Sequence, residues 1–333
     1  MRLFASTVFA AACLCASAVH ADTSSIPVPG PVRWDYVSVD ADTHRVYLAH
    51  STQVDVVDAQ TQKVVQQFTP TPGVHGVAVA ADLGRAFTSN GGSDEIGVFD
   101  LATGKSLGTV KVGQKPDAIA YDPLTHRVFS FNGKSLDISA VDGKTLKVLA
   151  RSIPVGGTPE FAVNGGNGQI YFNIEDRSEA AVLDTQALKL VRRYSLAPCD
   201  EPSGLAIDDK HRLYSVCGNQ LMVVSDPQTG KVLGHAPIGN GPDGVAWMDG
   251  KAYSANGRDG TISVVAEVAP GEFKTVATLK SEPGARTIAA DPSLHALFTP
   301  TAQFEAATAQ DAASHPKRPR ALDETFHLLV IKP

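Results

Sequence analysis

Seven polar positions recur along the chain at nearly even spacing. Each stands at the start of a short apolar run such as GVAVA or AIAYD, and consecutive positions are 40, 42, 43, 43, 40 and 43 residues apart. They are Asp35, His75, Asp117, Glu160, Ser203, Asp243 and Arg286. A period of this length, with one chemical position varied in every copy, indicates a chain built from repeated structural units.

Each copy contains four short strand-like runs. In the second copy these are GVAVA, a run around Phe87, IGVFD and SLGTVKV. Turns rich in Asp, Pro, Gly and His separate the first two runs, and no helical period is visible. Runs such as VDVVD and GVAVA are apolar on both faces, as stacked sheets require. The pattern predicts an all-β, seven-bladed β-propeller with four-stranded antiparallel blades, whose closure leaves no long exposed edge.

The two ends of the chain predict how the ring closes. The last copy supplies TIAAD, LFTPT and FHLLVIKP but no fourth strand, whereas SSIPVPG near the start is similar to the SIPVGG that ends at Gly157. We therefore expect the N-terminal strand to complete the last blade. Deletion of residues 24–31 should then destabilise the whole ring.

Residues 1–21 have the composition of a secretory signal peptide. Arg2 precedes an apolar stretch and small residues that end at Ala21, which predicts cleavage before Asp22 and a periplasmic protein without a membrane anchor. Residues 22–333 then form a single propeller domain, which we expect to be a monomer. Loss of Arg2 changes the formal net charge from −6 to −7, and this acidity disfavours a nucleic-acid partner.

Two cysteines remain in the mature chain. Cys199 precedes the first strand of the fifth copy and Cys217 ends the second, so antiparallel pairing brings both to one end of a hairpin. In an oxidising compartment this predicts a disulfide, with a metal or redox thiol pair and free buried thiols as alternatives. No CxxCH motif is present, which excludes attached c-type haem.

Several segments resemble the YVTN-repeat β-propeller family, the YncE-like exported proteins. They include APCDEPSGLAIDDKHRLYSVCGN, GPDGVAWMDGKAYSANGRDGTISVV and the closing FHLLVIKP, and the resemblance covers nearly all of the mature chain. It implies a seven-bladed propeller in a bacterial periplasm and no settled reaction. The tetrapeptide that names the family is poorly kept, for example as FTSN, YSVC and YSAN.

A second set of polar residues ends the second strand of most copies. Because the first and second strands are antiparallel, these residues should join the seven positions at one mouth of a central funnel. They are His50, Asn90, Asn132, Asn173, Asn256 and Thr301. Polar funnels carried on rigid strands are a common place for ligands to bind.

The charges in this funnel predict a cation site. Asp35, Asp117, Glu160 and Asp243 face only Arg286 and His75, and Glu201 adds a further carboxylate. Like charges held close need a cation, a ligand or a raised pKa. We expect a divalent ion, calcium on oxygen ligands or zinc with histidine, at Asp117, Glu160 and His75. The alternative is that each acidic residue merely accepts backbone hydrogen bonds and locks a loop.

Two neighbouring features bear on the funnel. Residues 302–325 break the period as an insertion in the last blade, either a lid over the funnel or a tolerated surface loop. Trp34 adjoins Asp35 and is positioned to cover a ligand.

Two classes of function follow from these observations. The first is an exported binding protein that takes a small ligand, a peptide or a partner protein at the funnel without catalysis. The alternative is a metal-dependent hydrolase resembling propeller lactonases, with Glu160 or Asp117 as ligand or base.

Overall fold

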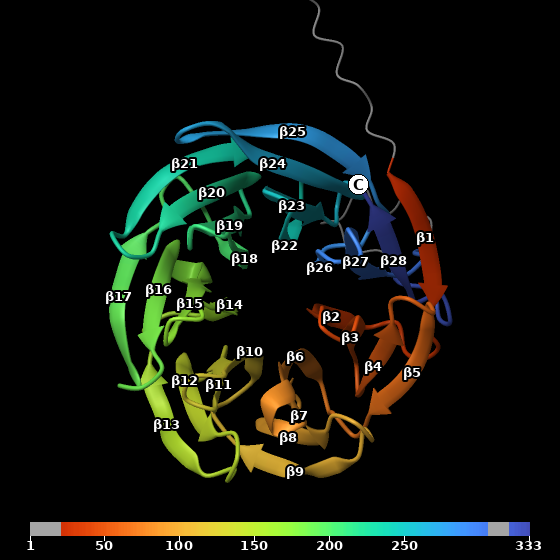
Figure 1. The fold of residues 1–333 in the computed structure, drawn as a ribbon, viewed down its shortest axis with the longest axis vertical. Coiled ribbons are helices and arrows are strands. Elements are labelled where there is room, and N and C mark those ends of the chain that lie inside the picture. Colours follow the sequence, from red (N-terminus) through yellow and green to blue (C-terminus); the bar gives the residue numbers. More distant parts are fainter. Residues whose placement is uncertain (1–20, 306–319) are drawn as a thin grey trace, which may run out of the picture.

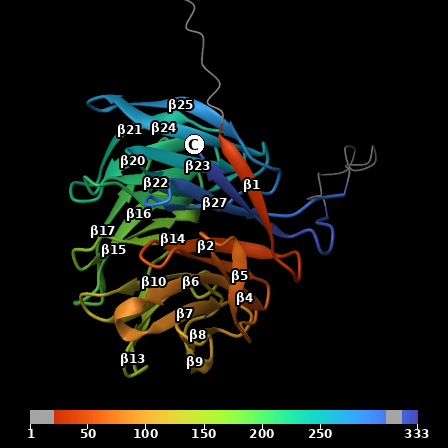
Figure 2. The same cartoon turned by 45° about the vertical axis from the view of Figure 1, so that its right-hand side comes forward.

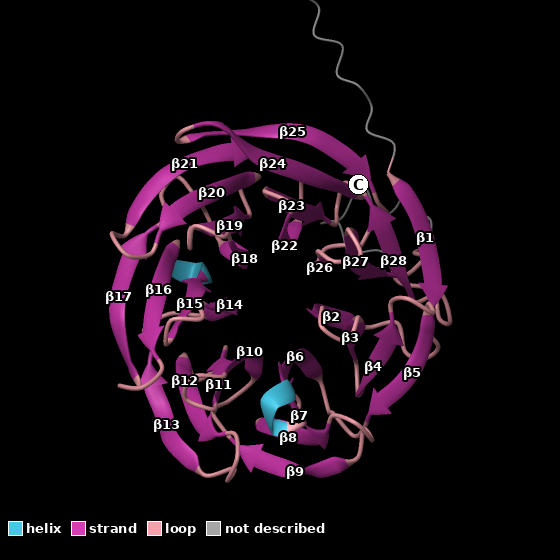
Figure 3. Ribbon diagram, in the orientation of Figure 1, coloured by secondary structure: helices cyan, strands magenta, loops and turns pink. Residues whose placement is uncertain are grey.

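The chain forms a closed ring of seven four-stranded antiparallel sheets, which confirms the predicted propeller (Figure 1). The computed structural model describes residues 21–305 and 320–333, and the predicted signal peptide lies almost wholly outside them. Strands make up nearly all of the regular structure, with two short 3₁₀ turns, η1 (Ala81–Leu83) and η2 (Glu175–Arg177) (Figure 3). Among the described residues, no helix has the length and apolar character needed to span a membrane.

The strands run from the centre of the ring outward within each blade. Blade 1 contains β2 (Trp34–Asp40), β3 (Arg45–His50), β4 (Gln53–Asp58) and β5 (Lys63–Phe68). Blade 2 contains β6 (Val74–Ala80), β7 (Arg85–Asn90), β8 (Glu95–Asp100) and β9 (Ser106–Lys111). Blade 3 contains β10 (Pro116–Asp122), β11 (Arg127–Asn132), β12 (Asp137–Asp142) and β13 (Val148–Pro154).

The later blades repeat this order. Blade 4 contains β14 (Pro159–Asn164), β15 (Gln169–Ile174), β16 (Glu179–Asp184) and β17 (Lys189–Ser195). Blade 5 contains β18 (Pro202–Ile207), β19 (Leu213–Cys217), β20 (Leu221–Asp226) and β21 (Lys231–Pro237). Blade 6 contains β22 (Pro242–Met248), β23 (Lys251–Asn256), β24 (Thr261–Ala269) and β25 (Glu272–Lys280). Blade 7 contains β26 (Ala289–Asp291), β27 (Ala296–Thr301), β28 (His327–Lys332) and β1 (Asp22–Pro27).

The hydrophobic core is divided among the seams between blades. At the seam of blades 1 and 2, Tyr47 and Phe68 pack with Val74 and Phe99, and the Phe68 and Phe99 rings stack 5.0 Å apart between centroids. Because both faces of each sheet pack against a neighbour, strands such as β4 and β8 are apolar on both sides. Contacts between β2 and β26 complete the ring, so no blade has an uncovered face.

The N-terminal strand closes the ring, as the sequence predicts. β1 pairs antiparallel with β28 from Asp22 opposite Lys332 to Pro27 opposite His327, and Figure 2 shows the two strands side by side. Ile26 is 3% exposed, so its burial contributes about 1.5–3 kcal/mol to this closure. The chain ends are thereby joined by strand pairing within one sheet.

The predicted disulfide between Cys199 and Cys217 is present, with an S–S distance of 2.02 Å and Cα atoms 5.4 Å apart. It links the loop before β18 to the end of β19. Both cysteines are buried and pack with Leu196 and Val223. The disulfide therefore fixes one end of the blade 5 hairpin.

The ends of the predicted insertion in blade 7 lie against each other. The Glu305 amide donates to the Arg320 carbonyl at 2.9 Å, and the Leu322 amide donates to the Gln303 carbonyl at 2.8 Å. Phe304 packs on Trp34, with ring centroids 6.2 Å apart. Residues 306–319, the centre of the proposed lid, lie outside the described residues.

Candidate functional site at the centre of the ring

A β-bulge re-aims the polar residue at the start of each innermost strand from β2 to β22. In blade 3, for example, the register shifts between Pro116 and Ile119, so that Asp117 lies in the bulge. The same irregularity surrounds the corresponding residues Asp35, His75, Glu160, Ser203 and Asp243. Bulges commonly turn a side chain out of the regular alternation near functional sites. Arg286 differs, because it precedes the short strand β26.

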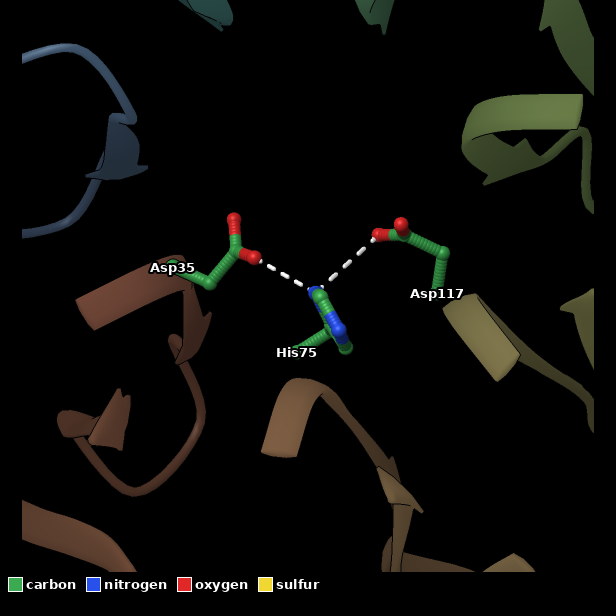
Figure 4. A group of neighbouring side chains, drawn as sticks. All are labelled: Asp35, His75 and Asp117. Atoms are coloured by element: carbon green, nitrogen blue, oxygen red, sulfur yellow. Dashed lines mark hydrogen bonds and ion pairs between the residues drawn. The ribbon is translucent and has the colours of Figure 1, made fainter. Parts of the chain in front are cut away.

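Three of these side chains point toward one another from neighbouring blades (Figure 4). The His75 Nδ1 atom lies 2.6 Å from an Asp35 carboxylate oxygen and 3.5 Å from one of Asp117. Their side chains are 17%, 22% and 13% exposed, respectively, so they are partly shielded from water. One ligand atom from each residue lies within 4.8 Å of the others, a separation suited to holding one ion.

Charge and burial shift the pKa values of His75 and Asp117. Burial alone would lower the pKa of His75, but the hydrogen bond with Asp35 and the charge of Asp117 raise that pKa above its usual 6.5. Burial raises the pKa of Asp117, with His75 opposing the shift and Asp35 adding to it. A proton on His75 or on Asp117, or a bound cation, would therefore relieve the repulsion within the trio.

Tyr36 and Glu160 form a second polar contact beside the trio. The Tyr36 hydroxyl donates to a Glu160 carboxylate oxygen at 3.1 Å. Burial, followed by the charges of Asp117 and Glu175, raises the pKa of Glu160 from 4.5 to about 9. Burial and the same acidic surroundings raise the pKa of Tyr36 well above 10.0. This raised pKa favours the protonated form of Glu160 near neutral pH.

The acidic surface extends outward from Glu160 over blades 4 and 5. Glu175, at the start of η2, shares a hydrogen bond with Glu160, and burial and then Glu201 act to raise the pKa of Glu175. Glu175 and Glu201 border a depression of about 650 Å³, with Asp176 and Asp200 beside them. Four further carboxylates therefore lie on this side of the site.

Arg286 balances the opposite side. Its Nε donates to Asp243 at 2.7 Å, and one Nη atom donates to the Trp34 carbonyl at 3.0 Å and lies 3.6 Å from Asp35. The guanidinium also stands over the Trp34 ring, 5.9 Å from its centroid. Trp34 itself is only 8% exposed and packs under Phe304 and Phe326, so it is part of the core between blades 7 and 1.

The second predicted set of funnel residues lies inside the blades instead. Each member is 0% exposed, so the expectation that these side chains line the funnel is wrong. They are His50, Asn90, Asn132, Asn173, Asn256 and Thr301. Asn132 shows why, because its amide donates to Asp137 and Ser139 at 2.8 and 3.1 Å and accepts from Ser130 at 3.1 Å.

Two other members of this buried set brace neighbouring segments. Asn173 donates to the Ser203 and Gly204 carbonyls at 3.0 and 3.3 Å, which holds the bulge of the next blade. His50 contacts Asp55 at 2.6 Å through Nδ1 and the Pro31 carbonyl through Nε2. The amides of Asn132 and Asn173 are used within the scaffold, so these two residues do not join Glu160 and Asp117 as ligands of one ion.

The structure groups the predicted site residues differently from the sequence-based prediction. Asp35 accompanies His75 and Asp117, whereas Glu160 contacts Tyr36 and Glu175. Ser203 is 9% exposed, and its hydroxyl donates to the Pro242 carbonyl at 3.3 Å. Sequence reasoning missed Tyr36 and Glu175. Tyr36 directly follows Asp35 inside the bulge, but no pattern along the chain pointed to Glu175.

Comparisons with known proteins identify the fold. No protein-family model matches the chain, and no curated protein matches it in sequence. Virginiamycin B lyase from Staphylococcus aureus is 12% identical, with a TM-score of 0.73 over 94% of this chain and 100% of that one.

Two further solved structures have the same architecture. A Kuenenia stuttgartiensis hydrazine synthase structure is 16% identical, with a TM-score of 0.68 over 82% of this chain and 94% of that one. The RRP9 WD40 repeats are 9% identical, with a TM-score of 0.76 over 93% and 97%. At these identities the likeness defines the class, a seven-bladed β-propeller, and not the activity.

Proposed function

We propose that this protein is an exported, YncE-like binding propeller whose central polar cluster holds a divalent cation at Asp35, His75 and Asp117. The observation that carries the proposal is the convergence of one ligand atom from each residue within 4.8 Å. A single imidazole nitrogen donates at most one proton, yet His75 Nδ1 faces carboxylates on both sides. A divalent ion would neutralise both carboxylates while neutral His75 served as a ligand.

The bound ion would then give the site its ligand chemistry. A cation held by three protein groups keeps open positions for an oxygen or carboxylate of a small molecule, peptide or partner protein. Arg286 lies beside Asp35 and offers a second positive group. The apolar signal-like N-terminus and the disulfide between Cys199 and Cys217 support export to an oxidising compartment.

Metal titration of chelator-treated protein tests this proposal. Calorimetry with Ca²⁺, Mn²⁺ and Zn²⁺ should show one equivalent of at least one ion bound. Asp35→Asn and Asp117→Asn should each weaken binding at least tenfold, about 1.4 kcal/mol. Asp243→Asn removes the same charge outside the trio and should weaken binding less than about threefold. Absence of stoichiometric binding, or equal weakening by all three substitutions, would overturn the proposal.

A metal-dependent hydrolase is the second candidate, favoured by the contact of Tyr36 with Glu160. Glu160, whose burial raises its pKa, lies beside the trio and would act as a general acid toward a bound substrate. Glu160→Gln should abolish hydrolysis of a responsive lactone or ester while leaving metal affinity unchanged. Metal-loaded protein that turns over none of a broad lactone and ester panel would remove this candidate.

A further inference from the structure

On the face opposite the central cluster, an arginine braces each of two neighbouring seams, those between blades 2 and 3 and between blades 3 and 4. Arg85 begins β7, and its Nη1 donates to the Gly143 and Lys144 carbonyls of blade 3 at 2.6 and 2.8 Å. Arg127 begins β11 and reaches the Thr185 and Gln186 carbonyls of blade 4 in the same way. In both seams, one guanidinium occupies the turn after the third strand of the following blade.

The seam between blades 1 and 2 has an arginine at the same position but lacks this contact. Arg45 holds the corresponding position, but its Nη1 pairs at 2.6 Å with Asp58 of its own blade. The carbonyls equivalent to those of Gly143 and Lys144 belong to Leu101 and Ala102. Within the described residues, Leu101 receives only a 3.5 Å contact from the Gln66 amide, and no donor reaches the Ala102 carbonyl.

An open cleft lies where the arginine would have been. Its volume is about 620 Å³, and it is bordered by Arg45, Leu101 and Ala102. Two acidic residues, Asp40 and Asp100, also line it. Tyr47 adds a hydroxyl, whereas Phe87 and Phe129 hold this position in the two braced seams. The cleft thus combines two carbonyl acceptors, two carboxylates and a phenol in a place that a guanidinium fills in the next two seams.

We infer that this cleft, the blade 1–2 socket, binds the guanidinium group of an arginine side chain presented by a peptide or partner protein. The incoming group would donate to the Leu101 and Ala102 carbonyls as Arg85 donates to its own pair. Its planar set of N–H donors matches paired oxygen acceptors better than an ammonium does. The carboxylates of Asp40 and Asp100 would favour its positive charge, and Arg45 stays bound to Asp58.

Titration of the full mature protein with Gly-Arg-Gly and Gly-citrulline-Gly, followed by backbone amide NMR, tests the inference. The arginine peptide should shift the amides of Leu101, Ala102 and Thr103, with affinity in the millimolar range for one side chain. Citrulline has the same shape without the charge and should bind at least tenfold more weakly. Equal affinity for both peptides, or shifts confined to the acidic surface at Glu160 and Glu175, would overturn the inference.

Two substitutions at the Arg45–Asp58 pair should act in opposite directions. Asp58→Asn keeps an oxygen for the turn but releases Arg45 to fill the socket, so peptide affinity should fall at least tenfold. Arg45→Ala leaves the socket open and removes a nearby positive charge, so affinity should be retained or increased. Full binding by Asp58→Asn, or loss of binding by folded Arg45→Ala, would contradict the inference.

Arg85→Ala provides a matched control in the next seam. Removing this guanidinium uncovers the Gly143 and Lys144 carbonyls, where the arginine peptide should produce new amide shifts. Shifts there, combined with none at Leu101–Thr103 in the unsubstituted protein, would show that the blade 1–2 socket is not a guanidinium site. Thermal unfolding of each variant checks that the propeller remains folded.

Discussion

Two sets of polar residues lie at the same end of the blades, and the structure gives them opposite roles. Asp117 lies in the bulge that begins β10, with a side chain 13% exposed near the centre of the ring. Asn132 ends the adjacent strand β11 and is fully buried. Pro116, which directly precedes Asp117, is the residue that pairs with Asn132. The bulge therefore separates a side chain that faces the centre from one that belongs to the scaffold.

The chemistry of the two sets of polar residues follows from this difference in side-chain direction. Most amides and hydroxyls in the buried set make hydrogen bonds inside or between blades, as Asn132 and Asn173 do, whereas the Asn90 Nδ2 atom has no partner among the described residues. Carboxylates occupy four of the bulges, where water is able to solvate them or a cation to neutralise them. The comparison teaches that the scaffold tolerates variation in the bulges, whereas changes in the buried set cost stability.

The largest expected effect is on stability, from substitution in the buried set. Asn132→Ala removes three hydrogen bonds and leaves Asp137 and Ser139 short of a partner, which should lower the free energy of unfolding by about 3 kcal/mol. Asn90→Ala removes one hydrogen bond and should cost about half as much. Asp117→Asn should change stability little. Urea unfolding measures the free energy of unfolding of all three variants. A larger loss of stability for Asp117→Asn than for Asn132→Ala would contradict the roles assigned to the two sets.

The second effect is a pH dependence from Glu160. Because its pKa rises from 4.5 to about 9 on folding, the stability this group contributes is complete below pH 4.5 and declines as pH rises toward 9. Allowing for screening at the open centre, metal-free protein should lose on the order of 2 kcal/mol between pH 5 and 9 through this group. Glu160→Gln should make the free energy of unfolding less dependent on pH. If the free energy of unfolding of the two proteins changes with pH in parallel, Glu160 is ionised in the folded state.

A smaller effect is expected at Arg286. Arg286→Lys keeps the charge beside Asp243 but cannot also maintain the planar contacts with the Trp34 carbonyl and ring. The free energy of unfolding should fall by about 1 kcal/mol. An equally stable lysine variant in urea unfolding would mean that charge alone is needed at this position.

The smallest effect is expected at Ser203, the uncharged member of the bulge series. Its hydroxyl makes one long hydrogen bond, of 3.3 Å, to the Pro242 carbonyl. Ser203→Ala should change the free energy of unfolding by less than about 0.5 kcal/mol and leave metal affinity unaltered. A tenfold change in metal affinity would place Ser203 in the site and enlarge the trio.

The period of the sequence was sufficient to predict the seven blades, the closing strand β1 and the disulfide. Each depends on strand order and antiparallel pairing, which short apolar runs and turn residues reveal. Side-chain direction at the ends of the strands depends on the bulges, which leave no distinctive pattern in one sequence. For this reason the sequence alone predicts Asn132 in the funnel and does not group Asp35 with His75 and Asp117.

The proposed partner of Glu160 shows a second limit of sequence reasoning. Glu175 lies outside the repeated polar positions, at the start of η2, and reaches Glu160 only through the arrangement of the blade 4 hairpin. Similarly, the open seam at Arg45 becomes visible only when its contacts are compared with those of Arg85 and Arg127. Equivalent residues in a repeat occupy the same position in the fold but do not necessarily make the same contacts.

Anomalous diffraction from crystals of the mature protein soaked in Mn²⁺ tests the central claim most directly. The account predicts one strong anomalous peak within coordination distance of Asp35, His75 Nδ1 and Asp117, which Asp35→Asn should remove or weaken. A peak held by Glu160 and Glu175 instead, or an ordered centre without any peak at saturating Mn²⁺, would contradict it.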